Sequence, residues 1–536
     1  MDFNRSQRLF FSISSGILLF GGWAGGIWQW MVVFAFVPLL LNEHYFCLNK
    51  DKFKTYHFFL HSYLTFFVWN AFSTWWIMKA TLVGAILAIA LNAFFMAFVA
   101  WIFHIVKRNF GIRIGYIFFI ALWLTFEYIH YNWELSWTWM TLGNAFSEQV
   151  KFIQWYEYTG VLGGSLYILL LNTLLCLIII QWIIDAYVKR KIVLFVVLLV
   201  VIPSSWSLYK YYSYKELGEP IEVLIVQPNI DPYNDKFSGL SSEKQLDIFL
   251  NLTEKNIKPN TRYIIGPETA LPDGIWEEDF DFHPYITTLK KFAKQYNVTF
   301  ILGASTYRMF ENKISPVARK FKNEELYYEA YNTALQIDST EVQTYHKSKL
   351  VLGVEKMPFP NTFSFLEKLA LDLGGTTGSL GIEKEPKNFV GLYNVAPAIC
   401  YESVYGEYLS KFVQKDAEWI TVITNDGWWD DTPGYKQHLS YSSLRAIEFR
   451  KSIARSANTG ISAIINQRGD ILQPTLWWQP ATINGIIYAN KYKTFYSIWG
   501  DYIGRISTFL TVLILLFFVA QKLMNKKILS KVTNSF

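Results

Sequence analysis

Cysteine and charge are both scarce in this chain. It has three cysteines among 536 residues, and Cys47 and Cys176 lie in or beside apolar segments, so no disulfide framework is indicated. Charged residues make up 17% of the chain, whereas about a quarter is typical of soluble domains. These deficits exclude a disulfide-stabilised secreted domain and an ordinary soluble protein.

Apolar residues are abundant instead, at 52% of the sequence, and aromatic residues reach 18%. They are concentrated in residues 1–210 and again near 505–524, while the part between has the composition of a soluble domain. The formal charge is +6, but the basic residues stand mostly in short clusters beside apolar runs. Such clusters encode membrane topology, so we expect a membrane protein that binds no nucleic acid.

The apolar part divides into segments long enough to cross a bilayer, which requires about 20 mostly apolar residues in a helix. Seven precede the globular region and one follows it: residues 9–25, 28–46, 57–78, 80–106, 114–131, 164–187, 191–209 and 504–524. The first follows Arg5 and Arg8, like a signal peptide, but further spans follow at once, which indicates an uncleaved anchor. We expect a transmembrane domain over 1–212, a globular domain over 220–495 and a closing transmembrane helix over 503–525.

Basic clusters stand at the ends of these spans. They are Arg5 and Arg8; Lys50, Lys52 and Lys54; Lys107, Arg108 and Arg113; Lys189, Arg190 and Lys191; and Lys522, Lys526, Lys527 and Lys531. If all eight segments cross, every cluster lies on one side, which the positive-inside rule makes the cytoplasm. Both termini are then cytoplasmic. The globular domain lies on the periplasmic side of a bacterial inner membrane.

Two features of the spans have more than one interpretation. The outer loop after the fifth span contains Trp133, Trp137 and Trp139. It is either an interfacial aromatic belt or a platform that receives lipid tails. Glu127 lies inside the fifth span, where an acid is costly, so we expect it to face protein or water in a structural or a direct role.

The globular region has a different pattern, in which short β-branched runs alternate with amphipathic stretches. The expected strands are 222–226, 263–266, 299–303, 332–338, 342–346, 391–399, 419–424, 461–466 and 482–488, and the expected helices are 242–256, 284–296, 405–414 and 436–458. The strands are mostly continuous apolar runs, as in sheets covered on both faces. This alternation predicts a layered α/β domain.

Three reactive residues stand at the ends of apolar strands in this region: Glu268, Lys347 and Cys400. A thiol attacks as the thiolate, so it needs a base or a nearby positive charge. A carboxylate can take the proton, and a lysine can stabilise the oxyanion that forms on the attacked carbonyl. Alone, a cysteine after a buried strand is structural more often than catalytic. Lys349 competes with Lys347, because residues two apart share one face of a strand.

Two further patterns do not indicate a bound ligand. Residues 370–381 contain four glycines and predict a mobile loop, but they lack the Gly-Lys-Ser/Thr ending of a phosphate loop. His57 and His61 have a spacing that can hold zinc on a helix. They have no glutamate between them and no third ligand nearby, so we expect no metal.

Motifs in a fixed order connect the reactive residues to a family. They are Val226–Ile230, Pro267–Ala270, Tyr345–Lys347 and Ile399–Glu402, followed by Thr424–Trp429 and Ser456–Ile461. In combination with the membrane segments, the chain resembles the bacterial apolipoprotein N-acyltransferases, a membrane-bound branch of the nitrilase (carbon-nitrogen hydrolase) superfamily. The resemblance covers nearly the whole chain.

The resemblance implies a polytopic α-helical membrane domain of about eight spans and an α/β nitrilase-like αββα sandwich. It makes Glu268 the general base, Lys347 the transition-state stabiliser and Cys400 the nucleophile, and it favours Lys347 over Lys349. Supporting or substrate-binding positions are also implied at Glu355, Tyr401 and Glu402. The chain departs from the family at residues 352–354, which read Leu-Gly-Val where Pro-Phe-Gly is common. This changes the substrate-facing surface and leaves the three reactive residues in place.

The implied reaction has two steps. Cys400 takes an acyl chain from a phospholipid as a thioester and passes it to the α-amine of a lipoprotein's diacylglyceryl cysteine. We expect ping-pong kinetics and a monomer in the lipid bilayer, with no metal or organic cofactor. One alternative is a membrane-tethered nitrilase-type amidase, although a single anchor would suffice for it. A transporter with a periplasmic binding domain is disfavoured by the few charges in the spans and the lack of a broken-helix repeat.

Overall fold

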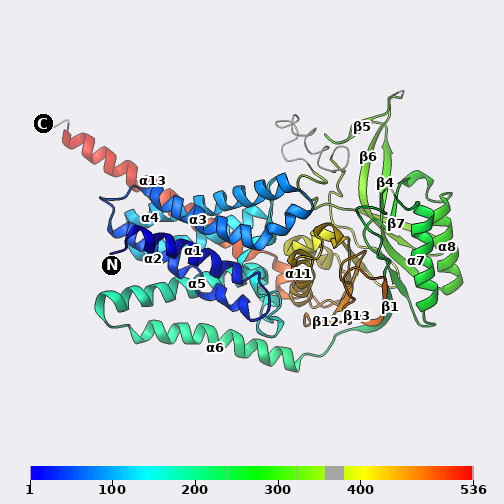
Figure 1. The fold of residues 1–536 in the computed structure, drawn as a ribbon, viewed down its shortest axis with the longest axis horizontal. Coiled ribbons are helices and arrows are strands. Elements are labelled where there is room, and N and C mark those ends of the chain that lie inside the picture. The colour runs from blue at the N-terminus through cyan, green and yellow to red at the C-terminus, as the bar shows by residue number, and fades with distance from the viewer. Residues whose placement is uncertain (1, 238, 323, 357–378, 534–536) are drawn as a thin grey trace.

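The computed structural model describes residues 2–237, 239–322, 324–356 and 379–533. Figure 1 shows a helical bundle at one end and a two-sheet sandwich at the other, with helix α11 (Pro433–Phe449) between them. Most of the glycine-rich segment 370–381 lies outside the described residues, so its interpretation as a mobile loop stays a prediction.

The bundle is built from long helices that follow the predicted spans. They are α1 (Arg5–Gly21), η1 (Gly26–Phe34) with α2 (Val37–Leu48), α3 (Thr55–Thr74), α4 (Leu82–His130), α5 (Tyr156–Asp185), α6 (Arg190–Ser213) and α13 (Tyr502–Thr533). Helix α4 contains two predicted spans, because its backbone leaves the helical conformation at Gly111, where φ is 80° and ψ is −177°. Among the described residues, five helices are long and apolar enough to cross a membrane. The exact number of spans stays a prediction.

The sandwich consists of two sheets. In the first, the order is β13 (Ala481–Ala489), β1 (Glu219–Gln227), β2 (Tyr263–Ile265), β4 (Thr299–Phe310), β6 (Tyr327–Ile337) and β5 (Arg319–Lys320), with β3 (Leu271–Trp276) on β4 and β7 (Val342–His346) on β6. In the second, the order is β12 (Ile471–Leu472), β11 (Ala463–Ile465), β10 (Ile453–Ala457), β9 (Trp419–Thr424) and β8 (Val395–Ile399). Strands β1, β2 and β4 run parallel, as do β8, β9 and β10.

Both faces of the first sheet are apolar because each packs on another layer. Along β1, Val223 and Ile225 belong to the core that also contains Ile399 and Trp419 of the second sheet. Their neighbours on the strand pack against two outer helices instead, α7 (Ser242–Asn256) and α8 (Pro284–Tyr296). Helices α10 (Gly406–Gln414) and α11 contribute side chains to the core of the second sheet. The predicted αββα sandwich is therefore confirmed.

The predicted helix over 436–458 is wrong in its second half. Helix α11 ends at Phe449, Arg450 adopts a left-handed conformation with φ 51°, and β10 follows. The polar residues of β10 hid the strand from the sequence pattern. A buried strand was expected to be apolar, but these residues are buried with polar partners inside the protein. Arg455 is fully buried, and its Nη2 donates to Asp426 Oδ2 at 2.6 Å.

Helix α11 joins the sandwich to the bundle through buried polar contacts. Trp139 Nε1 donates to Gln437 Oε1 at 2.7 Å, and Arg450 forms an ion pair with Glu157 at 2.6 Å. Trp139 is 1% exposed, so it packs at this interface and not in an aromatic belt. Glu127 Oε1 accepts hydrogen bonds from Trp123 Nε1 at 3.0 Å and from the backbone N–H of Leu142 at 2.9 Å, which supports a structural role.

Candidate active site

The three reactive residues converge between the two sheets. Glu268 follows β2 and Lys347 follows β7, both in the first sheet, and Cys400 follows β8 in the second. Their exposed fractions are 7%, 1% and 9%. The fold therefore brings together a carboxylate, an ammonium group and a thiol that are distant in sequence and shielded from bulk water.

Lys347 lies between two carboxylates. Its Nζ donates to Glu268 Oε1 at 3.0 Å and to Glu355 Oε1 at 2.9 Å. Burial alone would lower the pKa of Lys347, but the Glu268 and Glu355 carboxylates hold it well above its usual value. Lys347 therefore stays positively charged, as a group that stabilises an oxyanion must be.

Asn332 on β6 orients both carboxylates. Its Nδ2 donates to Glu268 Oε1 at 2.8 Å and to Glu355 Oε1 at 2.9 Å. The other oxygen of Glu268 accepts the backbone N–H of Asn425 at 3.1 Å. Sequence reasoning placed Asn425 in a family motif without a role, and it missed Asn332. The signal available for Asn332 was a polar residue inside a buried strand, which is too common to be decisive.

Lys349 is placed differently from Lys347. Its Nζ lies 5.0 Å and 5.4 Å from the ring centroids of Tyr405 and Tyr408, and it contacts neither Glu268 nor Glu355. Of the two lysines, the structure thus pairs only Lys347 with the candidate base.

Cys400 is held in a strained turn. Its φ is 51°, a left-handed conformation that costs a non-glycine residue of order 1–3 kcal/mol. Burial and the Glu268 carboxylate raise the pKa of the Cys400 thiol well above its usual value, against the opposing effect of Lys347. The resting thiol is therefore protonated, and a base must take its proton during attack.

Buried polar groups support the backbone of this turn. The Cys400 carbonyl accepts a hydrogen bond from Ser403 Oγ at 2.7 Å and lies 3.2 Å from His438 Nε2. The other ring nitrogen of His438 is 2.8 Å from Asp426 Oδ1, and Asp426 also pairs with Arg455. Sequence reasoning placed Asp426 in a family motif but gave no indication of His438.

Glu402 fastens the nucleophile turn to the end of β7. Its carboxylate accepts the backbone N–H of Ile399 at 2.9 Å, the backbone N–H of Ser348 at 2.7 Å and the hydroxyl of Tyr345 at 2.7 Å. Burial raises the pKa of Glu402 to about 7, against these hydrogen bonds. Glu402 therefore connects the strand end that carries Lys347 with the one that carries Cys400.

Tyr401 connects the turn to the membrane part of the chain. Its ring lies 6.4 Å from that of Trp137, in the loop after α4, and 5.2 Å from that of Tyr405. Trp137 is partly buried. The aromatic loop thus reaches the residue next to the nucleophile, and its interpretation as a platform for lipid tails stays a prediction.

The cysteine-containing clusters are poor metal sites. Cys400, Asp426 and His438 place ligand atoms within 4.8 Å of one another, but Arg455 already neutralises Asp426. In the bundle, Glu43, Cys47 and His104 are similarly close, and Lys107 pairs with Glu43. A resident cation would repel each basic partner. Within the described ranges, His57 and His61 belong to no such group.

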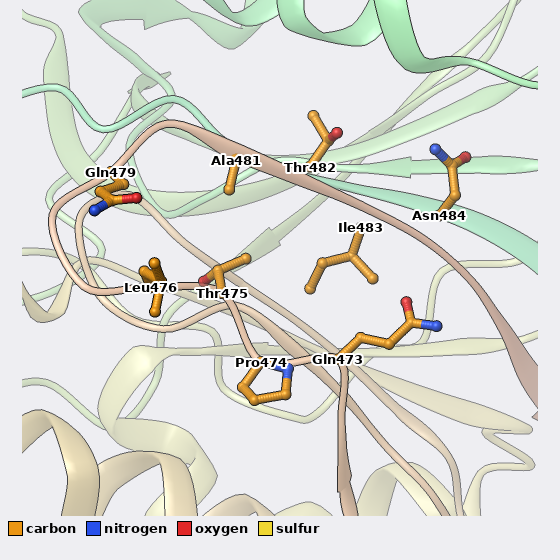
Figure 2. Close-up of a pocket in the computed structure, with 9 residues that line it drawn as sticks. All are labelled: Gln473, Pro474, Thr475, Leu476, Gln479, Ala481, Thr482, Ile483 and Asn484. Atoms are coloured by element: carbon orange, nitrogen blue, oxygen red, sulfur yellow. The ribbon is translucent and has the colours of Figure 1, made fainter.

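A groove elsewhere on the sandwich has no side chain suited to catalysis. Its volume is about 370 Å³, and Figure 2 shows that its lining side chains come from the segment after β12 and from β13. They are all uncharged and include no nucleophilic thiol or base. The groove is therefore not the reactive centre.

Gly303 on β4 fixes the position of the strand end that carries Glu268. A Cβ at Gly303 would lie 2.4 Å from the backbone nitrogen of Thr269 and 2.7 Å from Glu268 Cα. We expect Gly303→Ala to lower kcat by about a hundredfold, because a misplacement near 1 Å has that effect on a reacting group. Steady-state assays check this. Gly391→Ala is the matched control, since its Cβ would meet nothing closer than 3.4 Å. Equal activities of the two variants would contradict this role.

The arrangement as a whole suits acyl transfer. It offers a thiol that can form a thioester, a carboxylate that can move its proton and a fixed cation for the oxyanion. Attack by water on such a thioester gives hydrolysis, and attack by an amine gives N-acylation. The geometry alone thus indicates a cysteine acyltransferase or amidase.

Comparisons with known proteins distinguish the acyltransferase from the amidase. Residues 15–174 match the model of the apolipoprotein N-acyltransferase N-terminal domain, and residues 225–491 match that of the carbon-nitrogen hydrolases. The apolipoprotein N-acyltransferase of Chlorobaculum tepidum is 28% identical over 94% of this chain and 94% of its own length. That of Thermotoga maritima is 24% identical over 94% and 92%.

A solved amidase from Nesterenkonia is 14% identical and covers 51% of this chain and 91% of its own, with a TM-score of 0.34. Together the two family models cover most of the bundle, without α6 and α13, and nearly all of the sandwich. The named relatives match along almost their whole lengths. On these grounds the chain belongs to the apolipoprotein N-acyltransferase family, a membrane-bound branch of the carbon-nitrogen hydrolases.

Proposed function

We propose that this acyltransferase carries a fatty acyl chain on Cys400. The chain passes from a phospholipid to the N-terminal α-amine of S-diacylglyceryl-cysteine in a lipoprotein. The observation that carries the proposal is the contact of Lys347 with both Glu268 and Glu355 beside a buried, protonated thiol. Glu268, Lys347 and Cys400 are the catalytic residues, and one chain supplies all of them, which is consistent with a monomer.

The first step forms the acyl-enzyme. Glu268 takes the proton from Cys400 Sγ as the sulfur attacks an ester carbonyl of the phospholipid. Lys347 stabilises the oxyanion of the tetrahedral intermediate. The C–O bond to glycerol then breaks, and Glu268 returns the proton to the leaving alkoxide. The products are a lysophospholipid and a thioester on Cys400.

In the second step, the acyl chain passes from the Cys400 thioester to an amine. The α-amine of the diacylglyceryl cysteine attacks the thioester carbonyl, and Glu268 accepts the proton that the nitrogen loses. The C–S bond breaks, and Cys400 leaves as a thiolate that Glu268 reprotonates. Because both substrates use one site in turn, the kinetics are ping-pong.

The position of the site suits lipid substrates. Tyr401 lies against Trp137 of the bundle loop, and α11 fixes the sandwich against the membrane helices. Both substrates keep their tails in a bilayer, so the thiol has to lie close to the membrane surface. A soluble amide substrate would not require this placement.

A transfer assay tests the function. The purified protein in phospholipid vesicles is given a diacylglyceryl-cysteine peptide with a free α-amine, and a second sample receives the same peptide acetylated at that amine. We expect an N-acylated peptide and a lysophospholipid in the first sample only. Fatty acid release at equal rates in both samples, without N-acylated peptide, would instead support a membrane-tethered hydrolase.

We also propose an orientation with both termini in the cytoplasm and the sandwich in the periplasm. Figure 1 shows both termini at the end of the bundle far from the sandwich, which supports this orientation. In cells with a permeabilised outer membrane, an impermeant maleimide is expected to label Lys294→Cys on α8 but not Lys50→Cys after α2. The reverse pattern would contradict the orientation.

A further inference from the structure

Lys349 is a half-buried cation that the proposed chemistry does not use. Its ammonium group lies over the rings of Tyr405 and Tyr408, at 5.0 Å and 5.4 Å from their centroids. Among the described residues, no carboxylate lies within ion-pair distance of it. Charged side chains are rarely buried without a partner, because desolvation of the charge is costly. Lys349 therefore has two aromatic rings as neighbours but no counter-anion among the described residues.

The carboxylates around Lys349 are already engaged. Glu402 accepts the hydrogen bonds that fasten the nucleophile turn, Glu407 pairs with Arg505, and Glu134 pairs with Lys356 at 2.8 Å. Burial, together with the charges of Lys411 and Lys356, lowers the pKa of Lys349. Lys411 is exposed and has no ion-pair partner among the described residues. Positive charge is thus in excess at this position.

The excess charge lies between the nucleophile and the membrane domain. The backbone N–H of Lys349 is 3.3 Å from Glu402 Oε1, two residues after Cys400 in sequence. On the other side, the Tyr405 hydroxyl is 2.9 Å from Ser136 Oγ in the loop after α4. A lipid that presents an ester to Cys400 from the bilayer would have its polar end in this region.

We propose that Lys349, assisted by Lys411, binds the phosphodiester of the phospholipid acyl donor. The inference rests on the proposed function. In a glycerophospholipid, one glycerol unit carries both the phosphodiester and the acyl esters, so an anion site near the thiol can hold the headgroup during attack. Lysine binds phosphate as a compact point charge, and the two tyrosine rings stabilise its ammonium group before lipid binds.

The test compares two acyl donors with identical chains, phosphatidylglycerol and diacylglycerol, and measures the rate of Cys400 acylation in the full-length protein. Lys349→Met removes the charge and keeps a long unbranched side chain beside the tyrosines. We expect it to lower the phosphatidylglycerol-to-diacylglycerol rate ratio about tenfold, the effect of one charge-assisted hydrogen bond. Lys349→Arg is expected to retain most of the ratio. The matched control is Lys291→Ala, an exposed lysine on α8.

The outcomes separate the two claims. An unchanged ratio in Lys349→Met would overturn the phosphate site while leaving the acyltransferase assignment intact. Wild-type protein that neither lipid acylates would overturn the proposed function and this inference with it. Glycerol 3-phosphate added to the diacylglycerol reaction distinguishes a headgroup from free phosphate. If it restores the phosphatidylglycerol rate, the anion need not belong to the lipid, and the headgroup assignment is wrong.

Discussion

Cys400→Ser is expected to reduce acyl transfer by at least about a thousandfold and to eliminate the hydroxylamine-sensitive acyl-enzyme. A serine hydroxyl is far less acidic than a thiol, so Glu268 cannot activate it equally well. The substitution keeps a small polar side chain at a position where φ is 51°, so the strained turn is preserved. Transfer is measured with labelled phospholipid and a diacylglyceryl-cysteine peptide, and the acyl-enzyme on denaturing gels before and after hydroxylamine.

The two other cysteines supply the matched control. Cys47 contacts Glu43 at 3.1 Å inside the bundle, and Cys176 is fully buried there. We expect the Cys176→Ser protein to form the hydroxylamine-sensitive acyl-enzyme on Cys400, as the wild type does. A labelled thioester in Cys400→Ser would show that another residue carries the chain, and the assignment of the nucleophile would then be wrong.

Glu268→Gln is expected to lower transfer at neutral pH by about 10²–10⁴-fold, the usual contribution of a general base. Burial is the largest cause that raises the pKa of the Cys400 thiol, and it remains in the variant, so little thiolate exists at neutral pH without a base to accept the proton. In the variant, the residual rate should depend on thiolate formed by hydroxide. The thiolate fraction rises about tenfold per pH unit below the thiol pKa, so the residual rate should rise with pH in that proportion.

The pH profile distinguishes loss of a base from loss of structure. Glutamine also disturbs the contacts of Glu268. It replaces one carboxylate oxygen by an NH₂ group that accepts no hydrogen bond, so either Lys347 or the backbone N–H of Asn425 loses its acceptor. A misfolded site would give a low rate at every pH. Glu311→Gln, an exposed position, is the control and should retain the wild-type profile. A residual rate in Glu268→Gln that does not change between neutral and alkaline pH would contradict the role of Glu268 as the base.

The sequence predicted the layers of the fold because its apolar patterns are local and strong. Helices α7 and α8 begin and end at the predicted residues, and continuous apolar runs at β1 and β9 identified strands covered on both faces. The short strand β3 was missed, because Pro272–Gly274 reads Pro-Asp-Gly, a sequence that resembles a turn. Strand β10 was missed because the partners that bury Arg455 come from elsewhere in the chain.

The candidate site was predictable only in part. Glu268, Lys347 and Cys400 stand at strand ends, and motif order singled them out before any geometry was known. Asn332 and His438 gave no such signal, because each acts through neighbours that are distant in sequence. The resemblance already favoured Lys347 over Lys349, and the tertiary structure adds the contacts with Glu268 and Glu355 that only Lys347 makes.

The interface between sandwich and bundle was the least predictable feature. Trp139 has the composition signal of a membrane-interface residue, but it is buried against α11 and bonded to Gln437. Hydropathy measures how strongly a side chain prefers an apolar environment to water. It does not identify whether lipid or protein provides that environment. For the same reason, the sequence left both interpretations of the aromatic loop open.

Peptide mass spectrometry of the trapped enzyme tests the central claim most directly. Wild-type protein is incubated with a phospholipid of one defined chain and no acceptor, digested and analysed, and a second sample receives the diacylglyceryl-cysteine peptide before digestion. We predict that the peptide containing Cys400 gains the mass of one acyl chain in the first sample. In the second, it loses that mass as the acceptor's α-amine gains it. An acyl chain on any other residue, or N-acylated acceptor formed without passage through Cys400, would contradict the account.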